Sequence, residues 1–204
     1  MNKLYETKKN FRNMSSYPAK IRKRLSVLSD KAKLLFGALT CEHLYPNYVA
    51  FQQKADWGDA QVLFRAIQAM HLRISDDISS SPAQILGLMD CVELAMPGVN
   101  QCPDPSSQLA KDACIITLSS LEYMITKDIE SIVAVATYAR DAVKISEQTQ
   151  QGFSSGSCSA TRPNTATSAS MIREIRRQIN LIQELSKPQT QHITPALIDS
   201  LRTK

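Results

Sequence analysis

Apolar side chains recur at spacings of three and four residues along most of this chain, which is the pattern of helices with one buried face. Leu25, Leu28, Ala32, Leu35 and Leu39 predict one helix over residues 19–44. Tyr45-Pro46 is expected to end that helix, because a proline pushes the residue before it out of the α region. A short helix over residues 49–55 is expected to follow.

Helix start signals divide the rest of the chain. Asp59 is an expected N-cap, and Ser81-Pro82-Ala83-Gln84 fits a capping box with proline at the first helical position. Asp104-Pro105 and Thr194-Pro195 resemble that device, and Thr126 is expected to cap the helix after it. The predicted helices cover residues 60–74, 82–96, 106–125, 127–148, 171–185 and 195–201.

Two of these helices are apolar over a broad part of their circumference, those over residues 106–125 and 127–148. Such a surface marks central helices, and the tight turn between them predicts antiparallel neighbours. Residues 131–136, which are rich in Ile and Val, also fit a buried strand. Helical spacing continues on both sides of them and no partner strand is apparent, so we predict an all-α, single-domain helical bundle of about seven to eight helices.

Two segments depart from this pattern. Residues 150–170 are rich in Gln, Gly, Ser and Thr and nearly free of large apolar side chains, which predicts a flexible loop inside a helical domain of residues 19–204. Residues 1–18 are expected to form a basic flexible arm.

Charge is concentrated near the N-terminus. The chain of 204 residues carries a net charge of +5, yet its first 24 residues hold eight basic side chains and one acidic one, so the remainder nets −2. A basic arm either stays solvated without a partner or contacts nucleic acid through counterion release. The candidate nucleic-acid contacts are Lys8, Lys9, Arg12, Lys20, Arg22, Lys23 and Arg24.

The cysteines and histidines form no metal-ligand spacing, so no metal, cofactor or catalytic set is predicted. Cys41, Cys91 and Cys114 lie in helical apolar patterns and are expected to pack as small hydrophobic residues. Cys41 and His43 cannot form a catalytic dyad on one helix, because residues two apart point in nearly opposite directions.

No apolar run reaches the roughly 18 residues of a membrane span, and the N-terminus lacks the apolar region of a secretory signal. We therefore expect a cytoplasmic protein with no membrane partner.

A group of unusual motifs follows residue 40. Cys41-Glu42-His43-Leu44-Tyr45-Pro46-Asn47-Tyr48, then Gly58-Asp59-Ala60-Gln61 and Arg65, resemble the signature of a YjaG-like bacterial family of unknown function, domain of unknown function 416. Residues 110–114, Ala-Lys-Asp-Ala-Cys, are similar to a second segment of that family. The resemblance spans residues 20–204 and implies a helical bundle in a cytoplasmic bacterial protein. It implies no activity, and residues 150–170 lack the charged residues of the family.

The polar residues of these motifs are expected to meet at one helix junction, where the connection from Tyr45 to Gly58 folds back. Two interpretations stay open. In one, Glu42 and Arg65 form a structural ion pair while Asp59 caps its helix. In the other, the junction is a ligand site. The candidate residues are Glu42, Tyr45, Asn47, Tyr48, Asp59, Gln61, Arg65 and Asp112.

These patterns favour a non-enzymatic protein-interaction domain, an adaptor or an immunity-like protein, with an unknown protein partner. Self-association stays open. The alternative is a nucleic-acid-associated protein that uses the basic arm. An enzyme centred on Glu42, Asp59 and Arg65 has less support, because no phosphate loop or Ser-His-Asp set is present.

Deleting residues 1–16 tests the arm. This change removes most of the charge asymmetry and no periodic apolar residue, so the melting temperature should hardly change. Any nucleic-acid affinity seen by electrophoretic mobility should disappear, and in the full chain it should weaken steeply as salt rises. Unfolding on truncation would mean instead that the arm packs on the helical domain.

Overall fold

Eight α-helices and no strand make up the part of the chain that the computed structural model describes, residues 17–75, 80–98, 105–152, 168–187 and 193–202. The predicted all-α bundle is confirmed, and residues 131–136 are helical. None of the described helices is long and apolar enough to cross a membrane. The helices are α2 (Tyr17–Leu25), α3 (Asp30–Ala55), α4 (Ala60–Ser75), α5 (Pro82–Leu94), α6 (Pro105–Thr126), α7 (Ile129–Gly152), α8 (Ala169–Leu185) and α9 (Pro195–Arg202).

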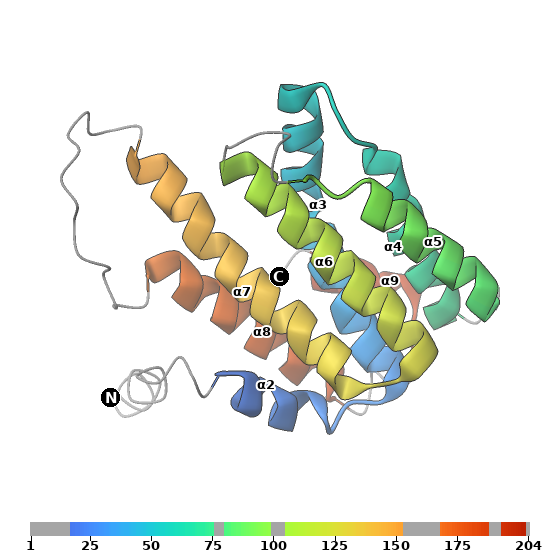
Figure 1. Ribbon diagram of the computed structural model, residues 1–204. Helices are drawn as coiled ribbons and strands as arrows, with labels where there is room; N and C mark the ends of the chain where they lie inside the picture. The colour runs from blue at the N-terminus through green and yellow to red at the C-terminus, as the bar shows by residue number, and fades with distance from the viewer. Residues whose placement is uncertain (1–16, 76–79, 99–104, 153–167, 188–192, 203–204) are drawn as a thin grey trace, which may run out of the picture.

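The core is built on three long helices. Figure 1 shows α6 and α7 as antiparallel neighbours, and α3 packs against both of them. Helix α3 is the most enclosed, since every residue from Leu34 to Cys41 is buried, whereas the sequence pattern indicated a single buried face. The other helices cover this centre, with α2 and α8 against α7 and α4 and α5 toward α6.

The absence of a side chain at Gly37 allows α3 and α6 to approach closely. A Cβ atom at Gly37 would lie 2.9 Å from Oγ of Ser120, which is tighter than real Cβ contacts. The sulfur of Cys41, one turn along α3, lies 3.5 Å from the same hydroxyl. This contact fixes the position of α3 against α6.

The chain breaks at a different place from the one predicted between residues 19 and 55. The single helix over 19–44 is wrong: α2 ends at Leu25, and α3 begins after Ser29, whose hydroxyl accepts from the amide of Ala32. The stop at Pro46 is also wrong, because α3 continues to Ala55. Pro46 removes one backbone hydrogen bond, but buried Leu44, Tyr48 and Phe51 hold the helix on both sides of it.

Most of the other helix starts are confirmed. The amide of Gln61 donates to the Asp59 carboxylate at 2.9 Å, and Ser81 and Gln84 form the capping box. Thr126 does not cap the next helix: it is the last residue of α6, and the Asp128 carboxylate accepts from the amide of Glu130.

The two departures from the helical pattern lie largely outside the described residues. The predicted loop is wrong at both ends: residues 150–152 belong to α7 and residues 169–170 to α8, because Ser168 caps α8 by accepting from the amide of Met171. Residues 153–167, most of the predicted loop, and residues 1–16 of the predicted arm are not described. Tyr17 and Pro18 belong to α2, and Tyr17 is buried.

Replacement by alanine is expected to change the free energy of unfolding in opposite directions at Gly58 and at Gly87. Gly58 has φ +98°, and a Cβ atom there would lie 2.6 Å from the Tyr48 hydroxyl, so Gly58→Ala should lower the free energy of unfolding by about 1–3 kcal/mol. Gly87 lies inside α5 with open space around its Cα, so Gly87→Ala should raise it by about 0.5–1 kcal/mol. Urea denaturation of both variants measures the two effects. Equal effects would contradict the turn geometry at Gly58.

Candidate functional site

Helices α3 and α4 form an antiparallel hairpin that sets the position of Glu42. The turn lies at residues 56–59, with Asp56 and Gly58 in left-handed conformations. Residues equally far from this turn face each other, which brings Glu42 of α3 to His71 near the end of α4. The imidazole Nε2 donates to Oε1 of Glu42 at 2.7 Å.

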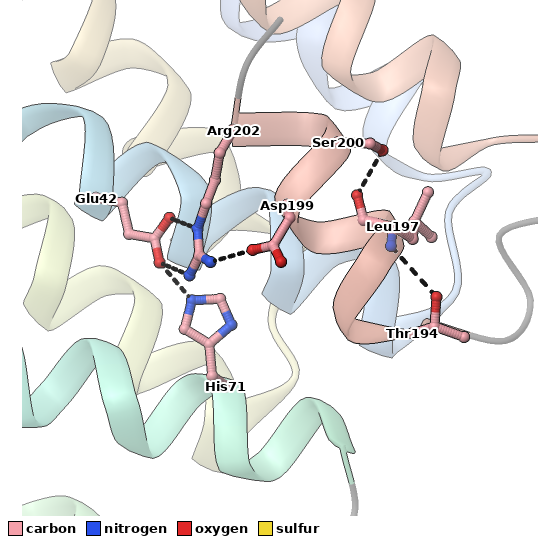
Figure 2. Close-up of polar contacts among 7 residues, drawn as sticks. All are labelled: Glu42, His71, Thr194, Leu197, Asp199, Ser200 and Arg202. Carbon is pink, nitrogen blue, oxygen red and sulfur yellow. Dashed lines mark hydrogen bonds and ion pairs between the residues drawn. The ribbon is translucent and has the colours of Figure 1, made fainter.

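Arg202 of α9 reaches the same carboxylate from the C-terminal end of the described chain. Its Nε donates to Oε2 of Glu42 at 2.9 Å and its Nη2 to Oε1 at 2.6 Å, and Figure 2 shows this fork and the imidazole of His71 converging on one carboxylate. The remaining guanidinium nitrogen, Nη1, donates to Asp199 at 2.7 Å. Bidentate Arg–carboxylate pairs are among the stronger polar contacts of proteins, so Glu42 connects three helices.

These partners keep Glu42 ionised. Partial burial raises the pKa of Glu42, but the hydrogen bonds from Arg202 and His71 outweigh that effect and lower the pKa to about 2. The same carboxylate raises the pKa of Arg202. A carboxylate with so low a pKa is a poor proton donor near neutral pH, which disfavours general acid catalysis by Glu42.

A second carboxylate, Glu174 of α8, lies deeper and is nearly enclosed. Arg177 donates to it through Nε and Nη2, both at 2.8 Å, and the amide of Gln178 donates to it at 2.8 Å. His43 Nε2 lies 3.6 Å from its Oε2, and burial, with Arg177 nearby, lowers the pKa of His43. Gln178 also accepts from the buried Tyr17 hydroxyl, so this network connects α2, α3 and α8.

The two carboxylate clusters border one cleft between α3, α8 and α9, with a volume of about 730 Å³. Leucine side chains from all three helices contribute apolar surface to it, and charged and amide side chains from the same helices contribute polar surface. The lining residues are Leu39, Glu42, His43, Arg177, Asn180, Leu181, Gln183, Glu184, Leu201 and Arg202.

The structure does not bring the predicted junction together. Arg65 does not pair with Glu42: its guanidinium lies 3.9 Å from the Asp59 carboxylate, both side chains are more than half exposed, and its Nε donates to the Gln61 carbonyl. The physical reason is that α3 continues without interruption through Pro46. The chain reverses after Ala55 rather than at Tyr45, so Glu42 faces the far end of α4.

The aromatic and amide residues of the motif have separate places. Tyr45 is half-buried with its ring centroid 6.2 Å from that of Phe64, and Asn47, which points to a different side of α3, is also half-buried. Tyr48 is fully buried; its hydroxyl donates to the carbonyl of Ala95 and accepts from the amide of Asp59, a structural role at the hairpin turn.

Asp112 is buried in α6 and does not line the cleft. It accepts from Gln108 at 2.9 Å, and burial raises its pKa to about 6. Its electrostatic neighbours are Lys111 and Asp141, so it belongs to a different part of the molecule from Glu42.

Two of the three described cysteines pack as predicted. Cys41 and Cys114 are buried, and burial raises the pKa of Cys41 to about 11 and that of Cys114 to about 12. The prediction for Cys91 is wrong, because it lies exposed on α5, whose outer face is also apolar in sequence. Among the described residues, no group of three or more His, Cys, Asp or Glu side chains could hold a metal ion.

The structure describes only some of the basic residues predicted to contact nucleic acid. Lys8, Lys9 and Arg12 lie outside it. Lys20, Arg22, Lys23 and Arg24 lie exposed on α2, and Arg22 pairs with Glu130 of α7 at 2.5 Å.

Comparison with known proteins assigns the chain to a family. The family model described as protein of unknown function (DUF416) matches residues 20–204. The chain belongs to the DUF416 family. This DUF416 chain is 27% identical over 134 residues to the uncharacterized protein YjaG of Escherichia coli (strain K12), covering 65% of the chain and 67% of YjaG. It is 25% identical over the same length to YjaG of Salmonella typhimurium.

A solved structure shares the fold of this DUF416 protein. The crystal structure of a DUF416 family protein from Shewanella baltica OS155 superposes with a TM-score of 0.73 at 21% identity. The match covers 89% of this chain and 91% of that one. The likeness at this identity shows the fold, and the resemblance to the family predicted from the motifs is confirmed.

Sequence reasoning on this DUF416 chain singled out Glu42 but missed the residues around it. Arg202 is 160 residues away and His71 is 29 residues away, so no local spacing signals either of them. Glu174 and Arg177 were not among the candidate residues, although Glu174 is buried and Arg177 lines the cleft.

The Glu42 contact predicts a pH dependence for this DUF416 protein. Its pKa falls on folding from the ordinary 4.5 to about 2, so its stabilising effect is present above pH 4.5 and is lost as the pH falls toward 2. Glu42→Gln should therefore be less stable than the natural chain at neutral pH, and the difference should shrink across that window. Urea denaturation at stepped pH measures the difference.

Arg65→Ala is the control, because the exposed Arg65–Asp59 pair should contribute no more than about 1 kcal/mol at any pH. A pH-independent difference for Glu42→Gln, or a larger loss for Arg65→Ala, would contradict this assignment of partners.

Proposed function

We propose that this DUF416 protein is a non-enzymatic protein-interaction domain of the bacterial cytoplasm, an adaptor or an immunity-like protein, and that it receives a polypeptide segment of its partner in the cleft between α3, α8 and α9. The observation that carries the proposal is the mixed lining of this cleft, in which leucines lie among charged and amide side chains. A lining of apolar and charged side chains suits a polypeptide segment, since apolar contacts supply affinity and the charged groups fix orientation.

The state of the charged groups also supports binding rather than catalysis. Glu42 and Glu174 are each held by an arginine fork, and both arginines are neutralised by these carboxylates. Cys41, the thiol nearest to the cleft in sequence, is fully buried with a raised pKa, which makes it a poor nucleophile. Preformed ion pairs of this kind orient a partner, and they exchange their partners at low cost where they are half exposed.

The size of the cleft fits a short segment. A volume of about 730 Å³ lies within the roughly 300–1,000 Å³ of ordinary ligand sites. A globular partner therefore contacts the cleft with one loop or one helix end, while the surrounding surfaces of α3 and α8 exclude water.

A second candidate is nucleic-acid binding through the basic arm. The exposed side chains of Lys23 and Arg24 on α2 favour it, while the pairing of Arg22 with Glu130 reduces the charge available. The deletion of residues 1–16 and the salt dependence of mobility test this candidate separately from the cleft.

Filling the cleft tests the leading proposal. Asn180 is exposed on the α8 wall, so Asn180→Trp should block the cleft without disturbing the core. Arg176→Trp places the same side chain on the same helix outside the cleft lining. The tagged full chain and both variants are used to capture partners from the native host, followed by binding measurements with the purified partner.

We expect the natural chain and Arg176→Trp to bind one and the same protein, and Asn180→Trp to lose at least about tenfold in affinity, as for a residue central to an interface. Equal binding by both tryptophan variants, or no partner above background, would contradict the proposal.

A further inference from the structure

Helix α9 is attached to the bundle by few contacts. Of its eight residues only Leu201 is buried, while Leu197 and Ile198 pack against the core with part of their surface exposed. Helices this short do not persist in water by themselves, because the first turn is costly to form and too few hydrogen bonds follow. The helical form of α9 therefore depends on its docking.

The place where α9 docks has a defined chemistry. We call it the α9 seat and define it by Leu39 and Glu42 of α3 and Leu181 of α8, which line the cleft together with Leu201 and Arg202. Glu42 takes the arginine fork, with Nε and Nη2 on its two oxygens. A lysine cannot reproduce this planar pair of hydrogen bonds, so the seat distinguishes arginine from lysine.

The ionic part of this docking is open to exchange. The side chain of Arg202 is 44% exposed and that of Glu42 is 23% exposed, and ion pairs at such exposure are screened by water and salt. Glu42 also accepts from His71, so the carboxylate stays partly satisfied when Arg202 leaves. Release of α9 thus leaves behind a carboxylate already oriented to receive another guanidinium.

We propose that the α9 seat is a receptor for a helix of the protein partner whose Leu-Arg end reproduces Leu201-Arg202, and that α9 occupies this receptor in cis until the partner displaces it. The inference rests on the proposed function, because it names the segment that the cleft receives. The seated α9 is itself the evidence for what fits: an apolar helix turn followed by an arginine opposite Glu42. A tethered competitor acts at an effective concentration in the millimolar range, so weak contacts suffice to keep the seat filled.

The experiment uses a fluorescent peptide with the sequence of residues 193–202, which includes the Thr194 cap, and the full-length protein. Opening the seat requires the double variant Leu201→Asp/Arg202→Glu, which removes the buried anchor of α9 and reverses its charge. Fluorescence anisotropy measures peptide binding to the natural chain and to the opened variant. Thermal melting checks that both remain folded.

We expect the peptide to bind the opened variant at least about tenfold more tightly than the natural chain, because the cis competitor is gone. A peptide carrying Arg202→Glu should bind the opened variant at least about tenfold more weakly, and one carrying Arg202→Lys should lie between the two. Glu42→Arg combined with Leu201→Asp/Arg202→Ala, which leaves no acidic side chain at position 202 to pair with the new arginine in cis, should reverse the order of the first two peptides.

Two results would overturn the inference: no saturable binding of the peptide to the opened variant, or equal binding of the Arg and Glu peptides. If the double variant does not fold, Leu201→Ala/Arg202→Ala, which removes both the anchor and the arginine without adding charge, provides the opened state, and the same comparison of peptides applies to it.

The outcomes separate this inference from the proposed function. If Asn180→Trp loses partner binding and the peptide does not bind the opened variant, only the inference that the α9 seat is a receptor is contradicted. If the peptide binds with the expected charge preference and Asn180→Trp leaves partner binding unchanged, the proposed role of the cleft in partner recognition is contradicted.

Discussion

The close contact of α3 with α6 at Gly37 and Ser120 sets the position of α3, on which the candidate site depends. It encloses α3 from Leu34 to Cys41, and a helix buried on all sides has only one register in which its apolar residues fit. Glu42 is the first residue of α3 after this enclosed run. Packing therefore fixes the backbone of Glu42 beside the cleft, and the contacts with Arg202 and His71 then orient its carboxylate.

The helices around Glu42 differ in how many buried residues hold them. The α3–α4 hairpin supplies His71, and α8 supplies Arg177, from helices that are anchored in the core by several buried residues. Arg202 comes from a helix with one buried residue. The cleft consequently has two walls, α3 and α8, that are anchored by several buried residues, and one wall, α9, that is attached by Leu201 and an ion pair, so its shape is most easily changed on the α9 side.

The sequence predicts the fold class and most helix starts, because the capping signals at Asp59 and Ser81 are local. It misleads at Pro46, where a strong local rule against helix is overcome by buried residues on both sides, and this single error misplaces the turn and pairs Glu42 with Arg65. The motif around Glu42 does contain the carboxylate on which Arg202 and His71 converge. Its partners His71 and Arg202 become visible only when the hairpin and α9 are placed in three dimensions.

The hydrogen bond from Tyr17 to Gln178 joins residues 161 positions apart, at opposite ends of the helical bundle in sequence. During synthesis the ribosome delivers α2 first, so the Tyr17 hydroxyl waits for α8, which at about 5–20 residues per second takes on the order of 8–30 s. Burying a hydroxyl without a partner costs about 1–3 kcal/mol, so the packing of α2 against α7 gains its full stability only when α8 is present. The nascent chain thus completes its bundle late, when the C-terminal helices emerge.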